Sequence, residues 1–177
     1  MRQRFRCILS DPPWAFRDQG SRIAPAKAGH YEVMSLSAII GLGDGVIGLS
    51  EKNAHLWLCA PNSFVLDGTA ELVAKMWGFR PVQQLTWCKN RIGMGHWMRN
   101  STEQILLCIR GRLAPMVRNL PTHLSGVATQ HSAKPDELYE HIEKISPGPR
   151  LEMFARRERE GWSSWGNEAP ASTRIDI

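Results

Sequence analysis

Long apolar runs are missing from this chain of 177 residues. The longest, such as Ile105 to Ile109, fall far short of the roughly 18–20 residues that a membrane-spanning helix needs. The basic stretch Met1 to Arg6 leads into only three apolar residues, so it lacks the core of a secretory signal peptide. We therefore expect no membrane segment and a cytoplasmic protein.

Closely spaced cysteines are missing as well. The cysteines Cys7, Cys59, Cys88 and Cys108 are widely separated, and the six histidines are scattered. Metal sites and redox dithiols need such residues at short, regular spacings. We therefore expect no metal site, and reduced cysteines buried in strands, where a thiol behaves as a small apolar side chain.

The composition is that of a folded protein, with 42% hydrophobic and 22% charged residues. The length fits one domain. We predict a single domain over residues 1–168, followed by a short C-terminal tail over residues 169–177. The 22 Lys and Arg exceed the 17 Asp and Glu and give a net charge of +5. Such an excess is a mild form of the charge pattern of proteins that bind polyanions.

Apolar patterns alternate along the chain between the periods of strand and helix. Compact apolar runs predict strands over Phe5 to Leu9, His55 to Ala60, Val82 to Cys88, Ile105 to Arg110 and Arg150 to Ala155. Helical spacing, glycine ends and an opening proline predict helices over Ser35 to Ile40, Asp67 to Trp77 and Pro135 to Ile145. The segments Asp18 to Tyr31 and Gly111 to Ala133 show no period and predict loops. This alternation indicates an α/β fold with a largely parallel sheet.

The motif Asp11-Pro12-Pro13-Trp14 directly follows the first predicted strand. Ligands of open α/β sheets bind outside the carboxyl ends of the strands. The Asp11 carboxylate and the Pro12 carbonyl accept hydrogen bonds, and Trp14 offers a flat face for stacking. Together they suit a planar base with an exocyclic amine, because accepting its N–H hydrogen bonds prepares the nitrogen to attack an electrophile. The alternative is a turn with an exposed tryptophan.

Further blocks of the chain extend this pattern from Ser10 to Glu168. They are His30 to Met34, Leu56 to Asn62, Trp77 to Phe79, Trp87 to Asn90, Gly93 to Glu103, Lys134 to Leu138, Pro147 to Arg156 and Gly161 to Glu168. In these blocks and their order, the chain resembles the amino-methyltransferases with an Asp-Pro-Pro-Trp motif. Within them it is similar to the adenine-N6 methyltransferases, which include the catalytic subunit of the messenger-RNA adenosine methyltransferase and many phage and bacterial enzymes.

The resemblance implies a Rossmann-like, S-adenosylmethionine-dependent methyltransferase fold in permuted order, with the catalytic strand first and the cofactor-binding strand last. It implies that Asp11, Pro12, Pro13 and Trp14 form the catalytic motif, in which Asp11 and Pro12 hold the target amine and Trp14 stacks on the adenine. Lys134, at a positive helix N-terminus, is implied to pair with the methionine carboxylate of S-adenosylmethionine. Further cofactor contacts are implied for Asp11, Glu152, Phe154, Arg156, Asn167 and Glu168.

The chain departs from the wider family in one place. It has no Phe-x-Gly-x-Gly loop after its last predicted strand, where Phe154-Ala155-Arg156 stands, as in the messenger-RNA-type branch. The glycines of the segment Gly41 to Gly45 do not replace that loop. They follow a predicted helix instead of linking a strand to one, so we do not assign them to nucleotide binding.

Three predicted loops carry basic and aromatic side chains that suit a nucleic-acid backbone. These residues are Arg17, Arg22, Lys27 and His30 in the first loop, Lys89, Arg91, His96, Trp97 and Arg99 in the second, and Arg110, Arg112 and Arg118 in the third. We predict that Lys89, Arg91, Trp97, Arg99 and Glu103 bind substrate together with Trp14, and that Trp97 and Glu103 close over the target base. Each charge could equally be an ordinary solvated one.

The sequence thus predicts a methyltransferase that acts on the N6 amine of adenine in nucleic acid. DNA is preferred, because small family members without appended RNA-binding regions resemble the phage and bacterial branch, and RNA is the alternative substrate. A second alternative is a non-catalytic nucleic-acid-binding subunit, although the intact motif favours an enzyme. We expect a short or loose target sequence, or specificity borrowed from a second subunit. The predicted protein partner is a second copy of the chain or a different subunit. A nicotinamide-dependent oxidoreductase lacks its glycine fingerprint here.

Overall fold

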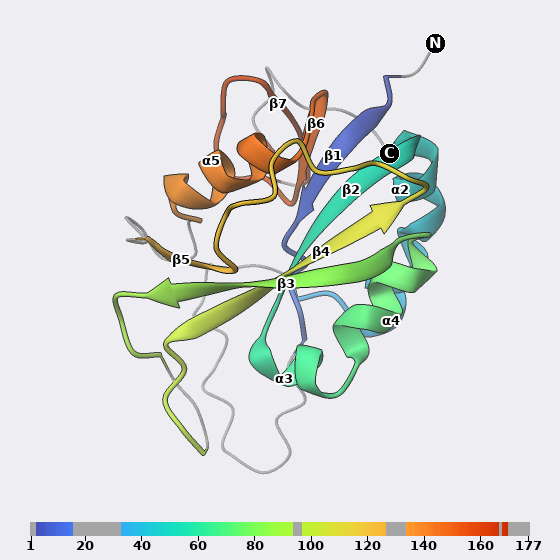
Figure 1. Cartoon of the computed structure of the whole chain (residues 1–177). Coiled ribbons are helices and arrows are strands. Elements are labelled where there is room, and N and C mark those ends of the chain that lie inside the picture. The colour runs from blue at the N-terminus through green and yellow to red at the C-terminus, as the bar shows by residue number, and fades with distance from the viewer. Residues whose placement is uncertain (1–2, 16–32, 94–96, 127–133, 167, 170–177) are drawn as a thin grey trace.

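The computed structural model describes residues 3–15, 33–93, 97–126, 134–166 and 168–169. Within them one sheet has the strand order β5-β3-β4-β2-β1-β6-β7 (Figure 1). Its strands are β1 (Phe5–Ser10), β2 (Ser50–Ala60), β3 (Arg80–Lys89), β4 (Thr102–Arg110), β5 (His123–Gly126), β6 (Arg150–Met153) and β7 (Trp162–Trp165). The helices are α1 (Leu36–Gly41), α2 (Gly43–Leu49), α3 (Asn62–Leu66), α4 (Thr69–Met76) and α5 (Asp136–Ile145).

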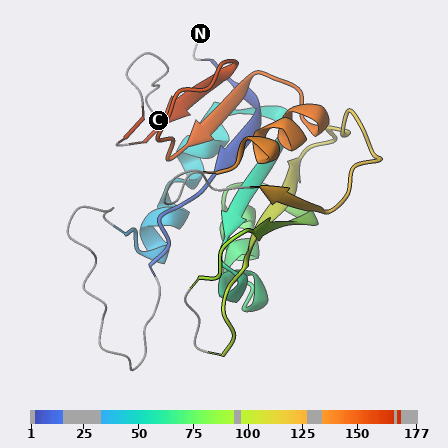
Figure 2. The ribbon, with the colours of Figure 1, turned by 90° about the vertical axis from the view of Figure 1, so that its left-hand side faces the viewer.

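The strands run mostly in one direction. β1 pairs in parallel with β2 and β6, β6 with β7, and β3 with β5. β4 lies between β2 and β3 and is antiparallel to both, so it alone among the described strands runs against the others. The predicted α/β fold with a largely parallel sheet is confirmed. Figure 2 shows β6 and β7 beside β1, so the strand that leads to Asp11 neighbours strands from the end of the chain.

The sheet buries both of its faces. Alternate residues of a strand point to opposite faces, and in β1 Ile8 joins one hydrophobic cluster while Leu9 joins the other. Residues of α1, α2 and α4 pack in the first cluster and residues of α5 in the second. Two-sided burial explains why the strands appear in the sequence as compact apolar runs without alternation.

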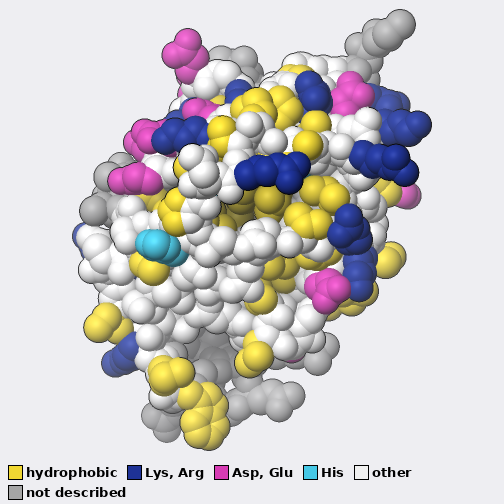
Figure 3. All heavy atoms as spheres, in the orientation of Figure 1, with side chains coloured by type: hydrophobic (Ala, Val, Ile, Leu, Met, Phe, Trp, Pro, Cys, Tyr) yellow, Lys and Arg dark blue, Asp and Glu magenta, His cyan; other side chains and the backbone are white. Residues whose placement is uncertain are grey.

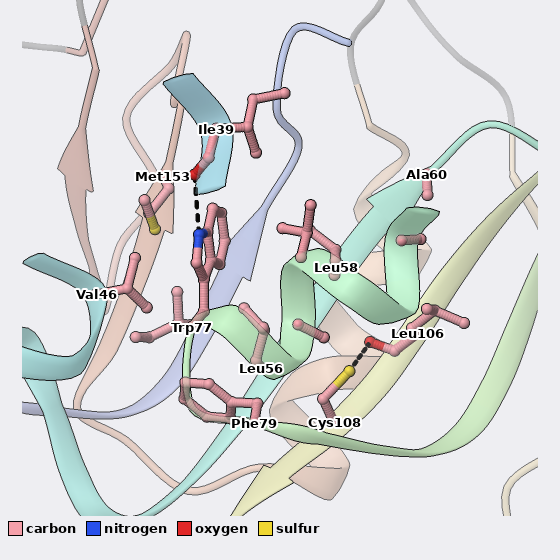
Figure 4. Packing of buried hydrophobic residues seen from close by; sticks show 14 of the residues in the cluster. Ile39, Val46, Leu56, Leu58, Ala60, Trp77, Phe79, Leu106, Cys108 and Met153 are labelled. Atoms are coloured by element: carbon pink, nitrogen blue, oxygen red, sulfur yellow. Dashed lines mark hydrogen bonds between the residues drawn. The ribbon is translucent and has the colours of Figure 1, made fainter. Parts of the chain in front are cut away.

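The helices on the first face are tied together by Trp77, whose side chain is fully buried. Figure 4 shows its indole N–H donating to the carbonyl of Ile39 in α1, over 2.9 Å. The ring packs in the same cluster as Val46 of α2 and Leu56 of β2. A buried tryptophan N–H needs such an acceptor, so this bond fixes where α1 lies.

Most predicted elements are confirmed within a few residues. Gly78 has a φ of +79°, the left-handed conformation expected after α4. Several features were missed. The helices α2 and α3 were not predicted, and β2 begins at Ser50 instead of the predicted His55. The segment Gly111 to Ala133 was predicted as a loop but contains β5, whose four residues are too short for a clear period. β7 was not predicted, and the last predicted strand ends at Met153 because Phe154 turns to a φ of +61°.

The cysteines are free, as predicted, and one lies in each of β1, β2, β3 and β4. Cys7, Cys59 and Cys108 are buried and Cys88 is partly buried. Burial raises the pKa of Cys7 and of Cys108 to about 12, so both thiols stay protonated. In the described ranges, no group of three or more His, Cys, Asp or Glu could hold a metal ion. No helix in those ranges is long and apolar enough to cross a membrane.

A buried polar network links β2 to the end of α5. His55 Nε2 donates to the Leu113 carbonyl over 3.0 Å, and His55 Nδ1 lies 2.8 Å from the hydroxyl of Ser146. The indole N–H of Trp57 donates to that same hydroxyl over 2.9 Å. Burial lowers the pKa of His55. The hydrogen bond to the Leu113 carbonyl raises it and the charge of Arg6 lowers it, and the net shift is downward. The ring is therefore neutral, and its Nδ1 accepts a hydrogen bond from the Ser146 hydroxyl.

We expect this network to make stability depend on pH. As the pH falls through about 6.5, His55 gains a proton in the unfolded state before the folded state does, so the free energy of unfolding falls. The loss should reach about 1 kcal/mol between pH 7.5 and 5.5. Urea unfolding of wild type and His55→Gln at both pH values measures it. The gap between the two proteins should narrow at pH 5.5, and an unchanged gap would refute the neutral His55.

Candidate active site

The residues after β1 form a rigid turn at the carboxyl edge of the sheet. The Trp14 N–H donates to the Pro12 carbonyl over 2.8 Å, and the Met34 N–H donates to the Pro13 carbonyl over 2.9 Å. The two prolines have no N–H of their own to satisfy and hold their φ angles fixed. The turn therefore joins the start of α1 to the end of β1 and leaves Asp11 at the edge.

Trp14 is buried, which excludes the alternative of a turn with an exposed tryptophan. Its indole N–H donates to the Cys59 carbonyl over 3.0 Å, and its ring lies 5.3 Å from that of Phe64 at an angle of 49°. These contacts anchor the turn to the end of β2 and to α3. Stacking of Trp14 on an adenine stays a prediction, and in this structure the ring packs on Phe64.

A buried lysine joins two carboxylates behind the turn. Lys134 Nζ lies 3.1 Å from Asp11 Oδ2 and 3.5 Å from Glu152 Oε1. The side chains of Lys134 and Glu152 are 9% and 5% exposed, whereas that of Asp11 is 34% exposed. Burial lowers the pKa of Lys134, but Asp11 and Glu152 outweigh it and hold the pKa above its ordinary value. Lys134 is thus a permanent cation, and its ion pair with Asp11 holds that carboxylate in place at the edge of the sheet.

A cavity of about 520 Å³ opens beside Asp11. Pockets of about 300–1,000 Å³ hold small ligands and cofactors. The wall combines the β1 turn, the start of α1 and the segments after β6 and β7. Its residues are Asp11, Pro13, Val33, Met34, Ser35, Ala38, Phe154, Ala155, Arg156, Trp165, Gly166 and Glu168.

The predicted cofactor residues meet at this cavity in part. Asp11, Phe154, Arg156 and Glu168 line it. Lys134 and Glu152 are not on its wall and reach it through Asp11, and Asn167 lies outside the described residues. The glycines at 41, 43 and 45 lie in α1 and α2 and do not line it.

The far wall depends on a close approach of two backbone segments. Gly166 has a φ of +139°, and a Cβ there would lie 2.9 Å from the Cα of Phe154. Phe154 itself has a φ of +61°, which is rare for a residue with a side chain. Its ring meets that of Trp165 edge to face, with centroids 5.3 Å apart. The strained Phe154 is held by this packing.

Gly166→Ala should therefore lower the free energy of unfolding by about 2–3 kcal/mol, through a steric clash added to backbone strain. Gly161 provides a matched control, because its φ is +77° and a Cβ there would meet nothing within 4 Å. Gly161→Ala should cost only about 1 kcal/mol. Urea unfolding of both variants measures the difference, and equal losses would contradict the close approach.

The predicted substrate loop follows β3. Lys89 Nζ forms an ion pair with Glu103 Oε1 and lies 5.0 Å from the ring centroid of Trp87. Both residues sit where β3 ends and β4 begins, which is the edge of the sheet that also carries Asp11. Arg91 and Arg99 are exposed, and Trp97 is 97% exposed. The loop thus presents an uncovered aromatic ring among cations, and its role in substrate binding stays a prediction.

The third predicted loop belongs to the other edge. Arg110 pairs with Ala54 near the start of β2 and donates to the Ile47 carbonyl, and the Arg112 N–H donates to Asn53. Figure 3 shows Lys and Arg side chains gathered over the region where Figure 1 places the arrowhead of β4. Arg110 and Arg112 therefore lie at the edge of the sheet opposite Asp11, because β4 runs antiparallel to β2. Contact of these arginines with phosphate stays a prediction. The first loop, with Arg17, Arg22, Lys27 and His30, and His96 of the second lie outside the described residues.

Comparison with known proteins gives consistent matches. The family model described as MT-A70 matches residues 5–168. A "Probable N(6)-adenosine-methyltransferase MT-A70-like" of Oryza sativa subsp. japonica is 31% identical over 97% of this chain and 24% of that protein. The human "N(6)-adenosine-methyltransferase catalytic subunit METTL3" is 25% identical over 98% of this chain and 30% of that protein.

A shorter relative matches along most of its own length. The "Type II methyltransferase M.MunI" of a Mycoplasma species is 25% identical over 99% of this chain and 82% of that protein. By contrast, the chain spans about a quarter of the length of the plant relatives. The matched region contains the β1 turn, Lys134, Glu152 and the cavity wall.

Proposed function

The chain belongs to the MT-A70 family, and from this premise we propose that it transfers a methyl group from S-adenosylmethionine to the N6 amine of adenine in nucleic acid. The observation that carries the proposal is the placement of Asp11. It follows the first strand, lines the cavity, and is bound from behind by the buried cation Lys134. N(6)-adenosine methylation in the names of several relatives supports the same reaction.

The cavity suits the cofactor in size and in charge. Its wall carries two carboxylates, Asp11 and Glu168, against one cation, Arg156. A slightly acidic pocket with one cation fits a molecule that carries a carboxylate, an amine and a sulfonium. The apolar part of the wall, with Phe154, Ala155 and Trp165, fits a nucleoside.

Bound S-adenosylmethionine supplies an electrophilic methyl group. We assign Lys134 to the cofactor carboxylate, and Arg156, Asn167 and Glu168 to its adenosine part. Asp11 and the Pro12 carbonyl accept hydrogen bonds from the target amine and hold its nitrogen in line, which supplies rate through orientation. The Asp11 carboxylate also accepts the proton that the amine releases. The buried Trp14 anchors the turn and keeps these acceptors fixed, so little reorganisation is needed during reaction.

DNA is the substrate that we propose first, because the match to the Type II methyltransferase covers 82% of that protein. RNA is the second candidate, because the adenosine methyltransferases of plants are the more similar in sequence, at 30–31% identity. In either case we assign substrate binding, that is contact with the nucleic-acid strand, to Lys89, Arg91, Trp97, Arg99 and Glu103. A base in a duplex must be flipped out, so single strands should be the easier substrate.

Methyl transfer from labelled cofactor to single- and double-stranded DNA and RNA of mixed sequence tests this proposal. Label in one nucleic acid, abolished by Asp11→Ala and retained by Asp44→Ala, would support an enzyme and identify its substrate. Asp44 is a matched control because it is an exposed carboxylate on α2 that does not line the cavity. Cofactor binding without transfer to any substrate would instead favour a non-catalytic subunit or one that needs a partner.

A further inference from the structure

A tyrosine behind the candidate site has no role in the function proposed above. Tyr139, in the first turns of α5, is buried, and its hydroxyl donates to Glu152 Oε1 over 2.9 Å. The same carboxylate oxygen lies 3.5 Å from Lys134 Nζ, which in turn lies 3.1 Å from Asp11. Tyr139 thus begins a chain of contacts that ends at the cavity wall.

The ring of Tyr139 is fixed independently of its hydroxyl. It meets the ring of Trp162 in β7 edge to face, with centroids 5.6 Å apart. The guanidinium carbons of Arg157 and Arg159 lie 5.2 and 4.4 Å from its centroid. Arg157 and Arg159 both donate to Asp136 at the start of α5. A phenylalanine would keep the ring in this setting and remove only the hydroxyl.

The hydroxyl is a permanent donor. Burial and the neighbouring Glu152 carboxylate raise the pKa of Tyr139 above its ordinary value, against the charges of Lys134 and Arg157. The phenol therefore stays protonated and always donates to Glu152. Glu152 Oε1 is contacted by two donor groups, the Tyr139 hydroxyl and Lys134 Nζ. Without the hydroxyl, Lys134 would be the donor left to the carboxylate.

We propose that Tyr139 is a positioning residue for cofactor binding. By donating a hydrogen bond to Glu152 Oε1, its hydroxyl weakens the hold of Glu152 on Lys134, so that Lys134 stays in contact with Asp11 as well. The inference rests on the proposed function, in which Lys134 pairs with the cofactor carboxylate. With the hydroxyl gone, Glu152 draws Lys134 away from Asp11 and from the cavity. The cofactor then loses part of its charge-assisted contact, although no residue that touches it has changed.

Calorimetric titration of the full chain with S-adenosylmethionine tests this role. Tyr139→Phe should weaken binding roughly tenfold, as expected for a hydrogen bond to a charged group. Binding of decarboxylated S-adenosylmethionine, which lacks the group that Lys134 holds, should change much less. A purely structural role of Tyr139 would weaken the binding of both ligands equally.

Ser146→Ala is the matched control, because it also removes a buried hydroxyl, next to the other end of α5, where it contacts His55 and Trp57. It should lower the thermal midpoint and leave the affinity for both ligands unchanged. Wild-type-like affinity in Tyr139→Phe, or an equal loss for both ligands, would overturn the inference alone. A wild-type chain that binds no S-adenosylmethionine would overturn the proposed function as well.

Discussion

Replacing Asp11 by asparagine should lower the rate of methyl transfer by about 10²–10³-fold, the usual cost of losing one fixed electrostatic contact at a reacting atom. The asparagine amide has nearly the shape of the carboxylate, but it carries no charge. It can also present an N–H to the target amine, which is itself a donor. The nitrogen then loses the acceptor that prepares it for attack.

The Asp11→Asn variant should still fold, because Asp11 is 34% exposed and Lys134 keeps its second partner, Glu152. Single-turnover assays with saturating cofactor and nucleic acid measure the chemical step separately from binding. Asp44→Asn again serves as the control carboxylate. A chemical rate in Asp11→Asn within about threefold of wild type would remove Asp11 from the reaction, since such a change falls well below the usual cost.

Replacing Lys134 by methionine should act on binding and on stability together. Methionine matches the lysine stem in length, so the packing beside α5 is retained. The variant leaves Glu152, 5% exposed, as a buried carboxylate without its cation. Breaking a buried ion pair in this way costs about 3–5 kcal/mol of folding free energy. Loss of the charge should also weaken cofactor binding by about 100-fold.

A second substitution separates the two effects. In Lys134→Met combined with Glu152→Gln, the buried charge is removed, and the glutamine carbonyl can still accept the bond from Tyr139. We expect this double variant to recover most of the stability and none of the affinity. Urea unfolding and calorimetry measure the two quantities on the same samples. Recovery of affinity with stability would show that Lys134 matters only for folding.

Local patterns of the sequence predict the parts of the site that depend on neighbours along the chain. A strand that ends in two prolines placed Asp11 at the sheet edge, and helical spacing after Pro135 placed Lys134 at the start of α5. The alternation of strands and helices gave the layered fold. These signals are local, because period and turn chemistry are set within about ten residues.

The parts that the sequence missed depend on contacts between distant segments. Tyr139 lies on the apolar face of α5 and looks like a core residue, and only the packing of α5 on the sheet brings its hydroxyl to Glu152. The need for glycine at position 166 is visible only in the structure, where the backbone of Phe154 leaves no room for a Cβ. Strand direction is likewise not local, so the sequence does not show that Arg110, at the end of β4, lies at the edge of the sheet opposite Asp11.

The measurement that tests the central claim most directly is nucleoside analysis of the methylated product. Nucleic acid treated with wild-type protein and S-adenosylmethionine is digested to nucleosides and resolved by mass spectrometry, beside a parallel sample from Asp11→Asn. We predict N6-methylated adenine as the product of wild type and its near absence with the variant. Methyl groups found on another base, or equal amounts of product from both proteins, would contradict the assignment of Asp11 and of the cavity beside it.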